Sequence, residues 1–425
     1  MAVIQQVPET QEPRPGDLTG RHNDPGEAHK KTGDAVTTDS RATSSQAVFL
    51  LSLPLFAMLG AVLMAPLLPR IEAEFAGSPH VDLLVPLMLT APALCLALLS
   101  PAAGALTDRF GARNVVLISL LAYGVAGTAP IYLHSLSAIL ASRLLVGVAE
   151  AGLVTGSTAL LGLCFDSDAN QKWFALQSFI LPLLGSVVVA ATGVLADHGW
   201  RLAFIVYGIS LVALVAGLRL VPRARAPLEE RAVARGWPPV RIIVLIACIA
   251  IPGSVFFYLG PVQVAYLLAH RGYDAPSTAS LVTSIGMIAG PPVVLLTRRM
   301  RRLSVGFVIG IGMALMGLGM LLMATGRTPT IIAAGLVIQQ GGGAMMYATA
   351  IAYTVSLATA ETQGAYSGTF YLIYSLAQFA TPFATSAAMA LVGDRLTSIL
   401  AFAAAAVVVA VLIATARPMR RRLVV

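Results

Sequence analysis

One carboxylate stands at the centre of a long apolar stretch, which is an unfavourable place for a charge. Glu150 lies at the middle of residues 136–164, and Arg143 precedes it by seven residues. On a helix this spacing is two turns, so both side chains share nearly one face, about 10 Å apart along the axis. A charge at the centre of a bilayer costs on the order of 3 kcal/mol, and such residues mark ion or substrate pathways. We interpret Glu150 as a proton carrier tuned by Arg143; a structural, hydrogen-bonded Glu150 is the alternative.

No other residue pattern in the chain suggests catalysis or metal binding. The six histidines fall in the N-terminal tail or in links between apolar runs. The three cysteines lie in apolar runs without CxxC spacing, which excludes a disulfide framework and a zinc module. A lone carboxylate supplies no nucleophile–base pair for an enzyme. We therefore expect no enzyme, no cofactor and no metal, with a proton gradient as the energy source.

The second half of the chain carries amides and phenols inside its apolar runs instead of charges. The candidates for a cavity wall are Tyr258, Gln263, Tyr266, Gln339, Gln340, Tyr347, Tyr371, Tyr374 and Gln378. Such groups suit an amphipathic organic molecule, which they would hold by stacking and a few hydrogen bonds. Ordinary helix packing is the alternative, because Gln and Tyr also bond between helices.

The elements that must position these residues are membrane spans. Of the 425 residues, 57% are hydrophobic and 11% charged, against roughly 45–50% and about 25% in soluble domains. Twelve apolar runs reach the length of about 20 residues that a bilayer requires. They lie near residues 47–69, 81–106, 114–133, 136–164, 173–195, 201–221, 241–268, 277–297, 303–324, 330–358, 365–391 and 396–416. The sequence therefore predicts an all-α membrane protein with twelve transmembrane helices.

Charge in the links predicts the domains and the orientation. A basic, proline-bounded link at residues 222–240 separates a six-helix bundle at 47–221 from another at 241–416. Counted from Lys30 onward, twenty Lys and Arg fall on the side of the N-terminus; five, Arg70, Arg201, Arg271, Arg327 and Arg395, fall on the opposite side. Because basic residues stay in the cytoplasm, we expect both termini and the 222–240 linker there. The same clusters account for the net charge of +8 without a nucleic-acid partner.

The two ends of the chain are expected to lie outside the membrane. Residues 1–46 are polar, with seven acidic and five basic side chains and no apolar run. Such a segment cannot bury enough surface to fold, so we expect a disordered cytoplasmic tail. It holds no apolar core of a cleaved signal peptide either. Residues 417–425 form a short basic cytoplasmic tail.

The two predicted bundles share a weak internal repeat. Ser100–Val116 aligns with Gly290–Gly306 at an offset of 190 residues, which superposes Pro101 on Pro291 and Arg109 on Arg299. Each segment follows the second run of its half, as duplication of a six-helix unit requires.

Several motifs of the first half resemble those of the major facilitator superfamily, closest to its drug–proton antiporter branch. GALTDRFGAR (Gly104–Arg113) is similar to the family's GxxxDRxGRR loop, although Ala112 replaces a basic residue and the second-half copy lacks the Asp and the Gly. The other matching segments are APLLP (Ala65–Pro69), RLLVG (Arg143–Gly147) and HGWRLAF (His198–Phe204). The resemblance implies a gating segment whose candidate residues are Gly104, Asp108, Arg109, Gly111 and Arg113.

The resemblance also implies a function. It predicts a monomeric secondary transporter of the plasma membrane that moves a small organic molecule by alternating access. Proton-coupled efflux is the first expectation, with Asp108 clasping the two halves on the cytoplasmic side. Residues 181–193 lack the GPxxGG pattern of many exporters, which keeps proton-coupled uptake of an organic anion or metabolite as the alternative.

Overall fold

The computed structural model describes residues 44–164, 167–221, 237–300, 302–359 and 362–416, together with Met419. The predicted N-terminal tail at 1–46 and the predicted linker at 222–240 therefore lie almost wholly outside the described residues. The same holds for the basic tail at 417–425 apart from Met419.

Twelve helices within the described part are long and apolar enough to cross a membrane. This confirms the predicted all-α, twelve-span architecture. Six crossings come from the first half of the chain. Their elements are α1 (Ser44–Ser52), α2 (Pro54–Val62), η1 (Ala65–Leu67), α3 (Leu68–Glu74), α4 (Val81–Phe110), α5 (Ala112–Thr128), η2 (Ala129–Ile131), α6 (Leu136–Cys164), α7 (Ser167–Asp197), η3 (Trp200–Gly208) and α8 (Ile209–Leu220).

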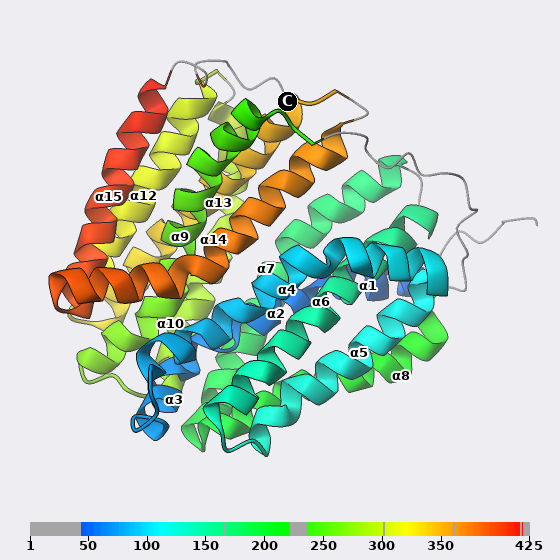
Figure 1. The fold of residues 1–425 in the computed structure, drawn as a ribbon, viewed down its shortest axis with the longest axis horizontal. Helices are drawn as coiled ribbons and strands as arrows, with labels where there is room; N and C mark the ends of the chain where they lie inside the picture. The colour runs from blue at the N-terminus through cyan, green and yellow to red at the C-terminus, as the bar shows by residue number, and fades with distance from the viewer. Residues whose placement is uncertain are drawn as a thin grey trace, which may run out of the picture. The chain divides into compact units, whose positions relative to one another are not determined.

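The other six crossings come from the second half, and each half has its own apolar core. The elements are α9 (Val240–His270), α10 (Pro276–Ile288), α11 (Gly290–Thr297), η4 (Arg298–Met300), α12 (Val305–Thr325), α13 (Pro329–Ser356), α14 (Gln363–Val392) and α15 (Arg395–Thr415). In Figure 1 the first-half helices, blue to green, and the second-half helices, green to red, form two neighbouring groups.

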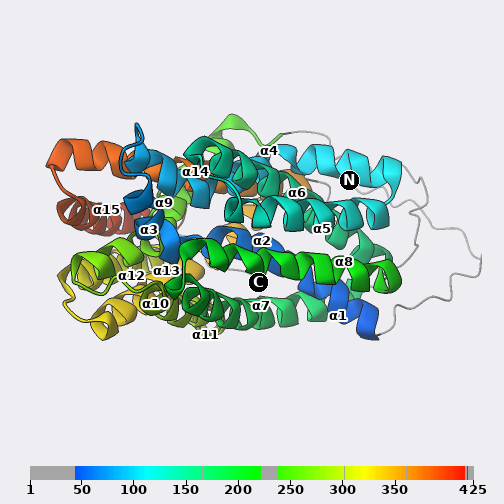
Figure 2. The ribbon, with the colours of Figure 1, turned by 90° about the horizontal axis from the view of Figure 1, so that it is seen from below.

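The first crossing is broken into four pieces, α1, α2, η1 and α3. Proline explains two of the breaks, because it lacks an N–H and cannot continue the hydrogen-bond ladder. Pro54 opens α2, and Pro66 lies in η1 between α2 and α3. The breaks allow α3 to pack against α9 of the other half, as Figure 2 shows.

Glycine brings α12 and α13 into backbone contact. A Cβ on Gly312 would lie 2.7 Å from the carbonyl oxygen of Gly342, and one on Gly335 would lie 2.8 Å from that of Gly319. These contacts form a glycine seam (Gly312, Gly319, Gly335 and Gly342) that only glycine can fill, as in close helix pairs within membranes. The seam joins α12 and α13 inside the second-half bundle.

The predicted gating loop is mostly helical, which corrects the expectation of a link after residue 106. α4 continues to Phe110 and α5 begins at Ala112, so Gly111 alone makes the turn. Its φ of 85° lies in a region that residues with a Cβ avoid, which explains why glycine stands there. Gly104, Asp108 and Arg109 therefore lie on the last turns of α4.

Candidate functional site

A cavity of about 300 Å³ lies between the two halves. Both halves contribute to its wall through helices α2, α4, α6 and α7 on one side and α9, α10, α11, α13 and α14 on the other. The wall is mainly apolar. Its polar side chains are Glu150, Tyr258, Gln340 and Gln378.

Glu150 contributes the carboxylate of the cavity wall. Its side chain is 2% exposed, and its Oε1 is buried without a hydrogen-bond partner among the described residues. Oε1 lies against the backbone of Gly60 in α2, where a Cβ would overlap it. A buried carboxyl without a partner is unfavourable as a purely structural group. Glu150 borders the cavity, and its role as a proton carrier stays a prediction.

Arg143 forms hydrogen bonds with the end of α5 and not with Glu150. Its Nη2 donates to the carbonyl oxygens of Ala126 and Gly127, each at 3.0 Å, at the end of α5. The Ala126 carbonyl lacks its helical donor, because Pro130, four residues later, has no N–H. A cation there also interacts favourably with the dipole of α5. Arg143 thus caps α5.

Two aromatic rings enclose the same guanidinium. The Arg143 Cζ lies 5.1 Å from the ring centroid of Phe204 and 4.8 Å from that of Tyr207. Arg143 itself is fully buried. No ion pair joins Arg143 and Glu150 in the described part of the chain, since Glu150 Oε1 has no partner there.

The second-half residues predicted to line the cavity fall into three groups. Tyr258, Gln340 and Gln378 line the cavity. Tyr374 extends this wall behind Tyr258, with ring centroids 6.3 Å apart, and Tyr347 packs on Tyr374 at 5.0 Å. Tyr371 joins the same aromatic cluster and is 51% exposed. Neither these last three tyrosines nor the other three predicted residues line the cavity, which corrects their predicted place on its wall.

Gln339 is the clearest case of helix packing. Its Nε2 donates to the carbonyl oxygens of Phe256 at 2.7 Å and Phe257 at 2.8 Å. Pro261 leaves the Phe257 carbonyl without its helical donor, so Gln339 replaces the missing bond. Its predicted place on the cavity wall is therefore corrected to a contact between α13 and α9.

Gln263 and Tyr266 lie instead near the end of the bundle that contains α3. Arg395 stacks over the Tyr266 ring at 3.7 Å, and its Nη1 donates to the Gln263 side chain at 3.3 Å. Arg395 also forms an ion pair with Glu72 of α3 at 3.8 Å, which links the two halves. These two residues thus belong to the contact between halves.

Asp394 fixes the helix start from which Arg395 projects. It accepts hydrogen bonds from the hydroxyl of Thr397 at 2.5 Å and from the Thr397 N–H at 2.8 Å. These bonds hold the pKa of the Asp394 carboxyl below its usual range. Such an N-cap stabilises the first turn of α15.

Other polar contacts join the two halves on the α3 side of the cavity. The Ser277 N–H donates to Asp197 at 3.0 Å, and the Ser284 hydroxyl donates to the Ser186 carbonyl at 2.7 Å. Between them a Cβ on Gly193 would lie 2.9 Å from the Ser277 Cα, so α7 and α10 touch closely. We call these contacts between the halves the seal; they are Glu72 with Arg395, Asp197 with Ser277, Gly193 with Ser277, and Ser186 with Ser284.

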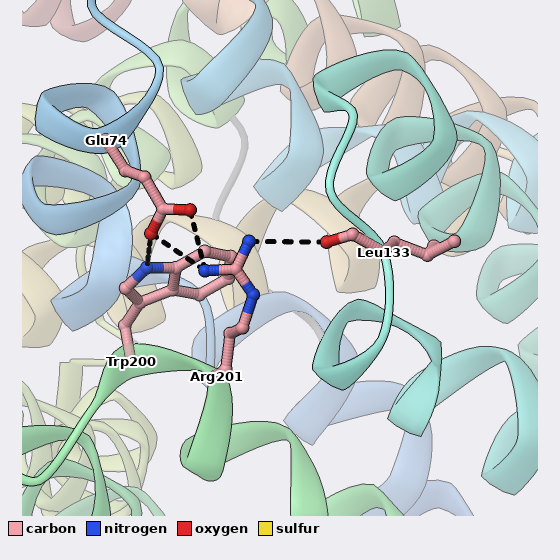
Figure 3. A network of polar contacts seen from close by, with 4 residues as sticks. All are labelled: Glu74, Leu133, Trp200 and Arg201. Carbon is pink, nitrogen blue, oxygen red and sulfur yellow. Dashed lines mark hydrogen bonds and ion pairs between the residues drawn. The ribbon is translucent and has the colours of Figure 1, made fainter.

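Glu74 anchors α3 to the first half (Figure 3). Its carboxylate accepts from Arg201 Nη1 at 2.7 and 2.8 Å and from the Trp200 indole N–H at 2.6 Å. Arg201 also donates to the carbonyl of Leu133 at 3.3 Å. The HGWR segment singled out in the sequence therefore holds α3, while Glu72 of the same short helix reaches the other half.

The gating candidates lie at the opposite end. Asp108 and Arg109 are exposed, and Arg109 lies over the Phe110 ring at 5.4 Å. Arg113 donates to the carbonyl oxygens of Leu218 and Val221, each at 2.6 Å, and so caps α8. The residue at 222 is proline, which leaves the Leu218 carbonyl without a helical donor.

Residues 50–382 match the Major Facilitator Superfamily. The chain belongs to this superfamily. It is therefore a multi-pass membrane protein of a transporter superfamily, as the sequence predicted.

Among curated proteins, the chain is similar to an efflux pump, a resistance protein and a vitamin transporter. It is 28% identical to the multidrug efflux pump LfrA of Mycolicibacterium smegmatis over 64% of this chain and 50% of that protein. It is 30% identical to the class B tetracycline resistance protein of Escherichia coli over 33% and 35% of the two chains. The niacin transporter NiaP of Acinetobacter baylyi is 27% identical over 30% and 29%. The matches span half or less of these relatives.

Solved structures of superfamily members share the fold. The nucleoside transporter NupG superposes with a TM-score of 0.69 over 86% of this chain and 98% of that one. The xylose transporter XylE of E. coli, in an inward-open conformation, gives 0.68 over 87% and 95%. Both are 13% identical, so the likeness concerns the fold alone.

Sequence reasoning missed most of the apolar cavity wall in this superfamily member. Met58 and Met287 meet over Gly185, and Phe257 also lines the cavity. Prolines contribute from four helices: Pro92, Pro182, Pro261 and Pro291. Proline inside an apolar run was the available signal, because it frees a carbonyl that must find a partner.

Proposed function

We propose that this transporter exports a small amphipathic organic molecule in exchange for protons across the plasma membrane. The single observation that carries the proposal is the Glu150 carboxylate, buried without a partner for Oε1 at the wall of the central cavity. A proton carrier must be able to gain and lose its proton during the cycle. A carboxyl that is committed to no ion pair and that borders the substrate cavity meets this requirement.

The other side of the cavity supports the class of substrate. Tyr258, Phe257 and Met287 offer apolar and aromatic surface, while Gln340 and Gln378 offer hydrogen bonds. Such a wall suits a compact molecule with a flat apolar part and a few polar groups. We propose that the protein works as a monomer, without a cofactor or metal.

The orientation in the membrane determines on which side of the cavity the seal lies. With both termini in the cytoplasm, as the charge bias of the links indicates, the seal lies on the outer side. The structure would then represent a state closed to the outside. The exposed Asp108 lies at the cytoplasmic end, and its partner in the clasp would come from the opposite half in the outward-facing state.

Efflux is favoured over uptake by the relatives. The multidrug efflux pump LfrA is an exporter by name, as is the bacillibactin exporter of Bacillus subtilis, 32% identical over 29% of this chain and 31% of that one. Proton-coupled uptake of an organic anion or metabolite remains the second candidate, supported by the similarity to the niacin transporter.

Proteoliposomes with an imposed pH gradient test both candidates, whichever way the protein inserts. The test compounds are tetracycline, tetracenomycin C, methylenomycin A and niacin, which appear in the names of relatives. Exchange for protons accumulates a compound on the acidic side, whereas co-transport accumulates it on the alkaline side. Protein-free liposomes correct for passive distribution of weak acids and bases. Fluxes that do not respond to the gradient would contradict proton coupling.

A further inference from the structure

The last turns of α2 are held by two phenolic hydroxyls from other helices. Tyr207 of η3 donates to the carbonyl oxygen of Gly60 at 3.3 Å, and Tyr123 of α5 donates to that of Phe56 at 2.7 Å. Gly60 belongs to the final turn of α2, which ends at Val62, so no residue of α2 lies four positions further on to donate to the Gly60 carbonyl. Both tyrosines are buried, so water does not compete for these bonds.

The same turn of α2 lies against Glu150. A Cβ on Gly60 would overlap the Glu150 Oε1 and would lie 3.5 Å from the side chain of Val146 on the same face of α6. The bare backbone at Gly60 is therefore one wall of the space that holds the carboxylate. Any displacement of α2 changes where that carboxylate can lie.

Arg143 holds one of the two tyrosines in place. Its guanidinium packs on the Tyr207 ring at 4.8 Å. The absence of a side chain at Gly127 leaves room for that ring, and Tyr123 packs beside it with centroids 5.3 Å apart. Arg143 is thus connected to Glu150 by packed groups: from the guanidinium to the Tyr207 ring, and from its hydroxyl to the backbone of Gly60.

We propose that Tyr207 and Tyr123 are positioning residues for the Glu150 carboxylate. Their hydroxyls keep α2 against α6, so that the carboxylate is confined between Gly60 and the cavity. The inference rests on the proposed function, in which Glu150 carries the coupling proton. It adds a route by which Arg143 influences Glu150 without an ion pair. Removing either hydroxyl releases the end of α2 and gives the carboxylate other orientations.

Amide hydrogen exchange of the full-length protein in lipid nanodiscs measures directly how firmly the two hydroxyls stabilise α2. Tyr207→Phe and Tyr123→Phe keep the rings and remove only the hydroxyls. Amides of residues 55–62 are expected to exchange about fivefold faster in each variant, the effect of losing one hydrogen bond. Tyr132→Phe is the matched control, because Tyr132 is 76% exposed. Unchanged exchange in both tyrosine variants would overturn the inference, even if Glu150 proves to carry no proton.

Infrared spectroscopy of the same samples reports on the carboxyl. The Glu150 band is the signal that Glu150→Gln removes, and its frequency is expected to shift in Tyr207→Phe and Tyr123→Phe but not in Tyr132→Phe. A band that stays in place in both variants would show that the hydroxyls do not position Glu150. A band that shifts but does not change with pH would instead contradict the proton-carrier role and leave the positioning intact.

Discussion

Arg143 and Glu150 lie two turns apart on one helix, yet the arginine binds the end of α5 and leaves Glu150 Oε1 without a partner among the described residues. The guanidinium donates to the carbonyls of Ala126 and Gly127 instead. The two side chains therefore do not bond to each other: Arg143 joins α6 to α5, while Glu150 faces the cavity. This separation leads to distinct expectations for substitutions at the two positions.

Glu150→Gln is expected to abolish gradient-driven transport while substrate exchange persists. The amide keeps the shape and hydrogen-bonding capacity of the side chain but cannot release a proton. Glu150→Asp should retain part of the coupling, because it shortens only the reach. Both are measured in the proteoliposome assay with an imposed pH gradient. A Gln variant that responds fully to the gradient would make Glu150 structural.

Arg143→Lys is expected to destabilise the protein, because one ammonium cannot bond two carbonyls and stack on two rings. Losing buried, charge-assisted hydrogen bonds costs about 2 kcal/mol. Thermal unfolding in detergent should therefore occur several degrees lower. Arg327→Lys, at an exposed position, serves as the control. An Arg143→Lys variant with unchanged melting and lost proton coupling would assign Arg143 directly to proton transfer.

Asp108→Asn is expected to impair transport while expression and insertion remain near normal. Asp108 is exposed at the end of α4 in this state, so neutralising it removes no buried interaction here. The effect should arise in the opposite state, where the proposed clasp forms. Transport rates and membrane levels measured on the same vesicles check this. Near-normal rates would remove Asp108 from the gating assignment.

Gly193→Ala is expected to open the seal. The added methyl would approach the Ser277 Cα, and overpacking of this kind costs about 1–3 kcal/mol, a shift of roughly tenfold between closed and open states. The reporter is Met58→Cys in the cavity, in a variant whose native cysteines are replaced by serine. An impermeant thiol reagent added outside the cells should then label this cysteine faster. Gly208→Ala, which has space for the methyl, is the control. Equal labelling rates would show that this contact does not hold the seal.

Deletion of residues 1–40 is expected to leave transport unchanged, because the segment has no apolar run with which to pack or to enter the bilayer. Uptake or efflux per molecule in the membrane is the relevant measurement. Lost activity at normal membrane levels would reveal a function for this segment.

The sequence predicted the fold well because bilayer thickness leaves a clear trace in composition. Each crossing needs a long apolar run, and the twelve runs could be counted directly. It also located Glu150, since a carboxylate inside such a run is rare. The helix boundary near residue 106 was placed too early, because Asp108 and Arg109 resemble loop residues although they lie on the last turns of α4.

The side-chain partners could not be predicted in the same way. Arg143 and Gln339 both serve carbonyls that prolines leave unbonded, at Ala126 and Phe257. The sequence shows each proline, but not which helix lies beside the freed carbonyl. That information comes only from tertiary packing, so Gln339 could be assigned to the cavity and Arg143 to Glu150 on periodicity alone.

The glycine seam between α12 and α13 indicates where this protein can tolerate sequence change. No methyl group fits at Gly312, Gly319, Gly335 or Gly342 without moving a helix. Random libraries that include these positions would yield mostly non-functional clones. Directed evolution towards new compounds should therefore vary cavity positions such as Met58, Met287 and Gln378 and keep this helix pair as an invariant scaffold.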